Sequence, residues 1–196
     1  MAPERWARVP VVYFIEREPF MSRHSKSLPK LFSSEFAKLH GIPGQGLDEG
    51  QVRMGLKAIL VIAGAGKKLS AKTMAWLRDE LSDIGTPEAV IDAIAAFDYS
   101  NTTLEQIAAP KPLNSIPGGL ARNVLFRAIR TAQVDGYSDA ERASVAAAAQ
   151  KFGIPAKAVK ELEEHAAAWQ DVDKQDSPDP AALQTMRKKR QALLSA

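Results

Sequence analysis

The stretch 134–141 constrains the fold of this chain more than any other, because it joins two amphipathic runs by a tight corner. Asp135-Gly136 is typical of a helix stop, since glycine tolerates the left-handed conformation that ends a helix. Ser138 is a good N-cap for the helix that follows, and Glu141, three residues later, completes a capping box. The pattern therefore predicts two antiparallel helices, one on either side of this corner.

The acidic residues of the corner, Asp135, Asp139 and Glu141, have two interpretations. Capping and the helix dipole explain all three, because a carboxylate is favourable near the positive end of a helix. Alternatively, the three carboxylates converge on a divalent cation. An EF-hand needs oxygen ligands at alternating positions over about twelve residues, and this loop is too short for one. The sequence therefore favours capping, with a metal site at these three residues as the alternative.

The absence of cysteine from the 196 residues excludes disulfides, thiolate catalysis and cysteine-ligated metals, and favours a reducing compartment. The histidines at 24, 40 and 165 are scattered without the spacing of metal ligands, and His165 is expected at the surface or as a capping residue. Residues 1–40 carry seven Lys and Arg against four Asp and Glu, whereas the remainder carries 19 of each. The net charge of +3 is thus an N-terminal property, which argues against broad nucleic-acid binding by the body of the chain.

Apolar spacing and helix punctuation predict an all-α protein, a compact bundle of about seven to nine helices. Residues 1–47 are expected to form an N-terminal arm and a first helix, 48–170 a helical domain, and 171–196 a C-terminal helix with a basic end. The expected helix starts and stops inside the domain include an N-cap at Ser70, a stop at Gly85 and a capping box at Thr102-x-x-Glu105.

The segment 64–68, GAGKK, matches a phosphate-binding loop only in part. Such a loop needs the pattern GxxxxGK followed by Ser or Thr, after a strand. Here Val61 occupies the position of the first glycine and Lys68 that of the hydroxyl residue. The segment is therefore interpreted as a corner that ends a helix.

The chain carries an internal repeat with a period of 68 residues. The matched positions are Ser70 with Ser138, Gly85 with Gly153, and Pro87 with Pro155. Identity elsewhere is poor, so what repeats is the order of long helix, corner, helix, Gly stop, Pro start and helix. Pseudo-repeats of about 51–109 and 119–169 would bury their apolar faces against each other. The alternative is chance, because Gly stops and Pro starts are common in all-helical proteins.

The stretch 128–142, AIRTAQVDGYSDAER, combines an Ala-rich helix, an Asp-Gly corner, a Ser and a Glu, and a helix ending in Gly follows it. In these features it resembles the tellurite-resistance TerB family. Residues 62–70, IAGAGKKLS, look like a second, degraded copy. In that copy Gly66-Lys67 replaces the Asp-Gly of the family and Thr73 stands in place of the Glu. The resemblance covers residues 51–169.

The resemblance implies an all-helical module without enzymatic activity that acts in a tellurite-type stress response. It implies a protein partner and a cytoplasmic location, with peripheral attachment at the inner face of the membrane as the alternative. It also implies a weak divalent-metal site at Asp135, Asp139 and Glu141, and no other cofactor. If the acidic corners of the family bind metal, the second corner here is the one that retains the acids.

A second hypothesis is binding to nucleic acid or to an anionic membrane surface. The basic residues that would carry it are Arg23, Lys26 and Lys30 of the arm and Arg187, Lys188, Lys189 and Arg190 of the tail. Arg122, Arg127 and Arg130 are also expected along one exposed helical side. A solvated charged face explains clusters of this size as well. An enzyme is the least favoured hypothesis, since the sequence offers no Ser/His/Asp or Cys/His arrangement.

Overall fold

The computed structural model describes residues 49–83, 86–109, 116, 118–175, 177 and 179–195. Over these residues the chain forms eight α-helices and no strand, which confirms the prediction of an all-α fold. The helices are α2 (Glu49–Ala63), α3 (Ala71–Asp83), α4 (Glu88–Ala95), α5 (Leu104–Ala108), α6 (Gly118–Gln133), α7 (Asp139–Phe152), α8 (Ala156–Asp173) and α9 (Pro180–Ser195). The arm and first helix predicted for residues 1–47 and the stop predicted at Gly85 lie outside the described residues.

The helix ends follow local signals in the sequence. Ser138 caps α7, and both reciprocal bonds of the capping box with Glu141 are present. Gly153 ends α7 with a φ of 72°, in the left-handed region that glycine adopts without steric cost. Ser70 Oγ accepts a hydrogen bond of 3.0 Å from the backbone N–H of the third residue of α3. These starts and stops are confirmed as predicted.

The capping box predicted at Thr102-x-x-Glu105 is wrong by one residue. The N-cap of α5 is Thr103, whose side chain accepts from the backbone N–H of Gln106 while the Gln106 side chain accepts from the backbone N–H of Thr103. Thr102 Oγ1 instead donates to the carbonyl oxygen of Asp98 at 2.7 Å. Gln and Glu both serve at the third position of a capping box, so the pattern alone does not separate the two registers.

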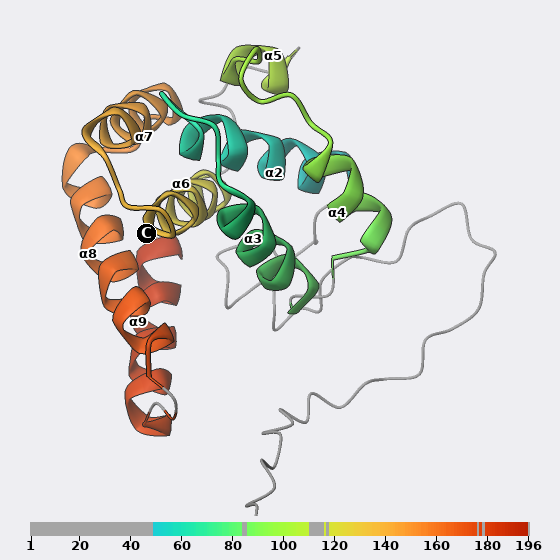
Figure 1. The fold of residues 1–196 in the computed structure, drawn as a ribbon. Helices are drawn as coiled ribbons and strands as arrows, with labels where there is room; N and C mark the ends of the chain where they lie inside the picture. Colours follow the sequence, from blue (N-terminus) through green and yellow to red (C-terminus); the bar gives the residue numbers. More distant parts are fainter. Residues whose placement is uncertain are drawn as a thin grey trace, which may run out of the picture.

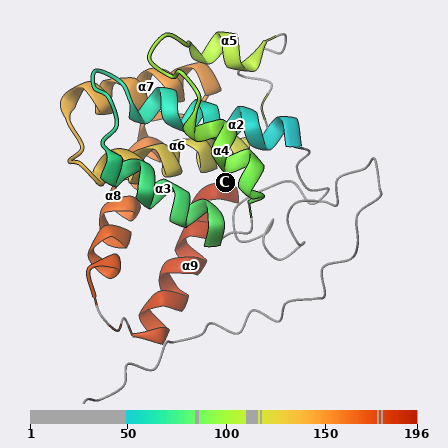
Figure 2. The same cartoon turned by 45° about the vertical axis from the view of Figure 1, so that its right-hand side comes forward.

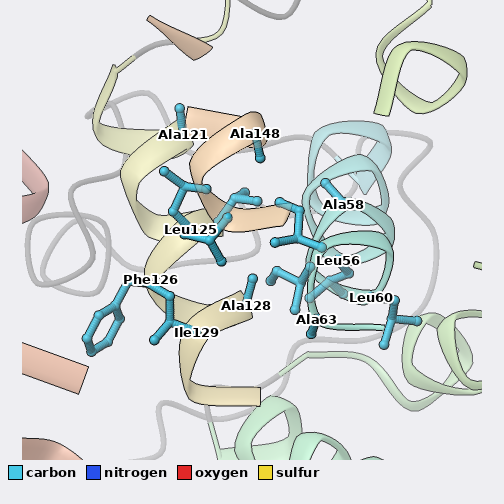
Figure 3. Close-up of a cluster of buried hydrophobic side chains, with 14 of the residues drawn as sticks. Leu56, Ala58, Leu60, Ala63, Ala121, Leu125, Phe126, Ala128, Ile129 and Ala148 are labelled. Atoms are coloured by element: carbon cyan, nitrogen blue, oxygen red, sulfur yellow. The ribbon is translucent and has the colours of Figure 1, made fainter. Parts of the chain in front are cut away.

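Two helices, α2 and α6, form the centre of the bundle. Helix α6 packs against α2, α3, α7, α8 and α9. Apolar side chains of α2 and α6 meet between the two helices, with Ala148 of α7 beside them (Figure 3). The hydrophobic residues of this pair that are fully shielded from solvent are Leu60, Ile62, Ala63, Ala121, Leu125, Ala128 and Ile129. Small alanines at the contact allow a short distance between the helix axes.

The helix boundaries follow the 68-residue shift. Moved by 68 positions, α3 would begin at residue 139 and α4 at residue 156, which are the first residues of α7 and α8. The same shift places the start of α2 at residue 117, one residue before α6 begins. The third pair differs in length, since α8 has 18 residues and α4 has 8. The order of elements is therefore repeated, and the two central helices are equivalent positions of the repeat.

The last helix, α9, packs against α6 and α8. Leu194 is fully buried there, and the Arg122 guanidinium donates to the carbonyl oxygen of Leu193 at 3.1 Å. Both views show α8 and α9 extending beyond the other helices (Figures 1 and 2). None of the helices that the structure describes has the length and apolarity needed to cross a membrane.

Candidate functional site

The α6–α7 corner, which the sequence singled out, lies against the α2–α3 corner. Asp135 Oδ2 accepts a hydrogen bond of 2.6 Å from Thr73 Oγ1 and one of 3.2 Å from the backbone N–H of Ser70. The two loops approach closely, because a Cβ atom placed on Gly66 would lie 3.1 Å from the Cβ of Ala140. Gly66 also has a φ of 79°. Glycine thus serves both the turn and the close contact at this position.

An ion pair with one buried partner joins the same two corners. The Glu141 side chain is fully buried, and Lys67 Nζ lies 3.0 Å from its Oε1. This contact has the distance of an ion pair without the direction of a hydrogen bond, since Oε1 has no hydrogen-bond partner. Glu141 Oε2 accepts from the backbone N–H of Ser138 at 2.7 Å and from its Oγ at 2.9 Å. Lys67 Nζ also donates to the carbonyl oxygen of Gly136 at 3.2 Å.

The two contacts between the corners are equivalent under the repeat. A shift of 68 residues carries Lys67 onto Asp135 and Thr73 onto Glu141. The Asp135–Thr73 contact is therefore the counterpart of the Lys67–Glu141 contact, with donor and acceptor sides exchanged. Reciprocal pairs of this kind are the mark of a two-fold, self-complementary interface. The two pseudo-repeats meet in this way within one chain.

The groups around Asp135, the exposed acid of this contact, favour the ionised form of its carboxylate. Hydrogen bonding to Ser70, followed by that to Thr73, lowers the pKa of Asp135 below its ordinary value, and the charge of Lys67 adds to the effect. Each of these groups stabilises the charged form of the side chain. Asp135 is therefore an anchor for the start of α3 as well as the end of α6.

The three carboxylates predicted as metal ligands are not brought together. Asp135 bonds the start of α3, Glu141 is buried against Lys67, and Asp139 is exposed in the first turn of α7. The part of the chain that the structure describes holds no group of three or more His, Asp or Glu side chains arranged for a metal ion. The Lys67 ammonium lies beside the buried carboxylate of Glu141, where a cation bound to this residue would have to lie.

The corner is also fixed to α8. The Tyr137 hydroxyl donates to Glu163 Oε1 at 2.7 Å, and burial followed by this bond raises the pKa of Tyr137. The Arg142 guanidinium lies 4.3 Å from the centre of the Tyr137 ring and 3.6 Å from Glu163 Oε1. Glu163 of α8 therefore contacts both Tyr137 of the corner and Arg142 of α7.

The prediction that Arg122, Arg127 and Arg130 lie along one exposed helical side is wrong. The exposed fraction is 13% for the Arg127 side chain and 8% for that of Arg130. Helices α3, α8 and α9 pack on α6 and cover this face. Arg130 binds Asp173 of α8 at 2.7 Å, and Glu80 of α3 lies 3.7 Å from both Arg127 and Arg130.

The expectation for His165 is also wrong, because this residue is fully buried in α8. Its Nε2 accepts a hydrogen bond of 2.9 Å from Trp169 Nε1, so the proton of the neutral ring is assigned to Nδ1. Burial lowers the pKa of His165 to about 4, with further contributions from the charges of Lys189, Arg190 and Arg130. The ring is therefore neutral near pH 7 and serves the core. The histidines at 24 and 40 lie outside the described residues.

Sequence reasoning named the second corner and missed its partner residues. Lys67 and Thr73 were noted as departures from the TerB-like pattern, without a role. The 68-residue shift is the signal that identifies Lys67 and Thr73, because it aligns them with Asp135 and Glu141. In a two-fold repeat, a residue of one copy can contact the residues of the other copy that stand at equivalent positions.

No family model matches the chain, and no curated protein matches it in sequence. A solved structure of a tellurite resistance protein from Nostoc punctiforme has a similar fold, with a TM-score of 0.55 and 22% sequence identity. The similarity covers 81% of this chain and 91% of that one. At this identity the likeness concerns the fold. The chain therefore has the all-helical fold of that tellurite resistance protein, and the resemblance to the TerB family is confirmed at the level of the fold.

Proposed function

We propose that this chain is a TerB-like helical module without enzymatic activity that acts in a tellurite-type stress response by binding a protein partner. The fold shared with a tellurite resistance protein supports a role in the tellurite-type stress response. The observation that carries the proposal is the closed pair of corners, in which the carboxylates bond groups of the chain itself. The contacts between the two corners hold the two pseudo-repeats in one fixed arrangement, as a binding module requires.

The stress role is tested by growth on tellurite. A strain that lacks the gene should be more sensitive to tellurite than the parent, and the wild-type gene should restore growth. The partner is tested in the same strain by affinity capture of the full-length chain followed by quantitative mass spectrometry. Unchanged growth on tellurite would contradict the pathway, and recovery of no protein above background would contradict the partner.

Weak divalent-metal binding at the corner of Asp135, Asp139 and Glu141 is the competing proposal. A cation at Glu141 would have to displace the ammonium of Lys67, 3.0 Å away, and no third carboxylate is in place. We therefore assign the role of the cation to Lys67. The wild-type chain should show no saturable heat when Ca²⁺, Mg²⁺ or Zn²⁺ is titrated in a calorimeter.

A double variant supplies the positive control for this titration. Lys67→Asp with Thr73→Glu places acids at the repeat counterparts of Asp135 and Glu141, so four carboxylates would face one another across the corners. Oxygen-rich sites of this kind suit Ca²⁺, and this variant should bind it. Saturable binding by the wild type that Asp135→Asn abolishes would instead establish the metal site.

A second candidate function keeps the basic tail as a contact for anionic membranes or nucleic acid. One observation favours it, namely that Lys188 and Lys189 are exposed on α9. The arm residues that would assist, Arg23, Lys26 and Lys30, lie outside the described residues. Binding of this kind weakens steeply with added salt. A failure to bind anionic vesicles or DNA at low salt would exclude it.

A further inference from the structure

A cleft of about 180 Å³ lies between α3, α6, α8 and α9. Four guanidinium groups line it: Arg127, Arg130, Arg187 and Arg190. Its aromatic lining includes Trp76 of α3 and Trp169 of α8. None of the lining residues belongs to either helix corner, so the cleft is separate from the contact described above.

The charges in the cleft are not balanced. The nearby carboxylates are those of Glu80 and Asp83 in the lining and of Asp173 beside it. The last of these binds Arg130 at 2.7 Å, whereas Glu80 lies at 3.7 Å from Arg127 and from Arg130 and is shared between them. Four guanidinium groups against three carboxylates leave an excess of positive charge.

Arg190 is the group with the least compensation. It forms no ion pair with any residue that the structure describes, and its buried Nε lacks a hydrogen-bond acceptor. Its guanidinium lies 5.2 Å from the centre of the Trp169 ring. Burial lowers the pKa of Arg190 to about 10; the neighbouring charges of Arg127, Arg130 and Arg187 act in the same direction, and the charge of Glu80 opposes them. Arg190 is partly buried, and a partly buried cation with a buried, unused donor is stabilised by an anion.

The aromatic residues hold the arginines in place. The Arg130 guanidinium lies 5.1 Å from the centre of the Trp76 ring and 5.8 Å from that of Trp169. Stacking on aromatic faces fixes the plane of a guanidinium and leaves its edge free to donate. Two of the four guanidinium groups, those of Arg130 and Arg190, are thus held against aromatic rings before a ligand arrives, which reduces the entropy lost on binding.

We propose that this cleft binds a phosphate group, held by Arg190 together with Arg187 and the α6 arginines. Phosphate fits better than a carboxylate, because it offers three acceptor oxygens and a charge of about −1.5 to −2 to several guanidinium groups at once. The cleft is smaller than the roughly 300–1,000 Å³ of sites for drug-sized ligands. The bound group is therefore free phosphate or the phosphate of a nucleotide whose remainder extends outward.

The test is a titration of the full-length chain with sodium phosphate at constant ionic strength, followed by calorimetry and by tryptophan fluorescence. Two of the three tryptophans line the cleft, so the fluorescence should change with saturation. A parallel titration with adenosine monophosphate distinguishes the two sources. Tighter binding of the nucleotide identifies a nucleotide phosphate, and equal binding identifies the free anion; both support the cleft. No saturable binding of either ligand would overturn the proposal.

Matched variants on α9 distinguish phosphate binding in the cleft from nonspecific attraction by positive charge. Arg190→Gln should weaken phosphate binding by about tenfold or more, because it removes a charged donor. Lys188→Gln removes the same charge from an exposed position on the same helix and should weaken binding by less than about twofold. If Arg190→Gln does not fold by circular dichroism, Arg187→Gln replaces it with the same expectation. Equal weakening by the cleft variant and by Lys188→Gln would refute a specific site.

Discussion

Replacement of Lys67 by methionine tests the ion pair between the two corners. The variant keeps the length and much of the apolar stem of the side chain, and removes the ammonium that lies 3.0 Å from Glu141 Oε1. Glu141 is fully buried and would retain its two bonds to Ser138. Its other oxygen would face no positive charge.

The expected loss of stability follows from the burial of the two partners. Removing one partner of a buried ion pair costs about 3–5 kcal/mol, because the remaining charge stays buried and uncompensated. The Lys67 side chain is 33% exposed, so water replaces part of its effect. We expect Lys67→Met to lower the free energy of unfolding by about 2–4 kcal/mol. For a chain of this size, that loss corresponds to a fall in Tm of roughly 5–15 °C.

Urea denaturation followed by circular dichroism measures this change, with Lys68→Met as the matched control. Lys68 is the exposed neighbour of Lys67, and its replacement should change stability by less than about 0.5 kcal/mol. The double variant Lys67→Met with Glu141→Gln should be more stable than the sum of the single changes predicts, because it leaves no buried charge. Equal effects of Lys67→Met and Lys68→Met would refute the reasoning.

Three further predictions concern the core and the second corner. His165 has a pKa of about 4 in the folded chain against 6.5 when exposed, so its contribution to stability is present above pH 6.5 and is lost as the pH falls towards 4. Urea denaturation at a series of pH values should show that His165→Gln removes roughly 3 kcal/mol of this pH dependence. Gly64→Ala should lower stability by about 1–3 kcal/mol, because its Cβ would lie 2.5 Å from the Tyr99 ring. The control Gly55→Ala, inside α2, meets nothing closer than 3.6 Å and should raise stability by about 0.5–1 kcal/mol in the same assay. Tyr137→Phe removes the hydroxyl bond to α8 and should lower the thermal stability by about 1 kcal/mol; an unchanged Tm would show that this bond contributes nothing.

The parts of the fold that could be predicted depend on local chemistry. Ser138 with Glu141, Gly153 and Pro155 act through bonds and dihedral angles within a few residues, and the helices begin and end where these signals stand. The repeat could be found for the same reason, since its markers are caps and stops. Local signals failed where two adjacent residues offered the same chemistry, as at the N-cap of α5.

The parts that could not be predicted depend on which faces meet. Whether Arg130 is exposed depends on the docking of α3 and α8, because Asp173 of α8 binds its guanidinium and Trp76 of α3 and Trp169 of α8 lie against it. His165 is expected at the surface or as a capping residue because the sequence offers it no partner ligands for a metal, yet it is buried and its hydrogen-bond partner Trp169 lies one turn away on the same helix. Sequence spacing gives the face of a helix but not the element that covers it.

The buried carboxylate of Glu141 lies at the contact between the two corners. An acid at this position needs a cation, and a metal ion or an ammonium can supply one. A metal would make closure of the two corners depend on the free metal concentration, because a ligand that binds the folded state stabilises it by mass action. Lys67 belongs to the chain, so its charge is present whenever the corner forms. Residues 67 and 73 are the repeat counterparts of Asp135 and Glu141, and the lysine at the first of these positions supplies a positive charge beside the buried carboxylate of Glu141.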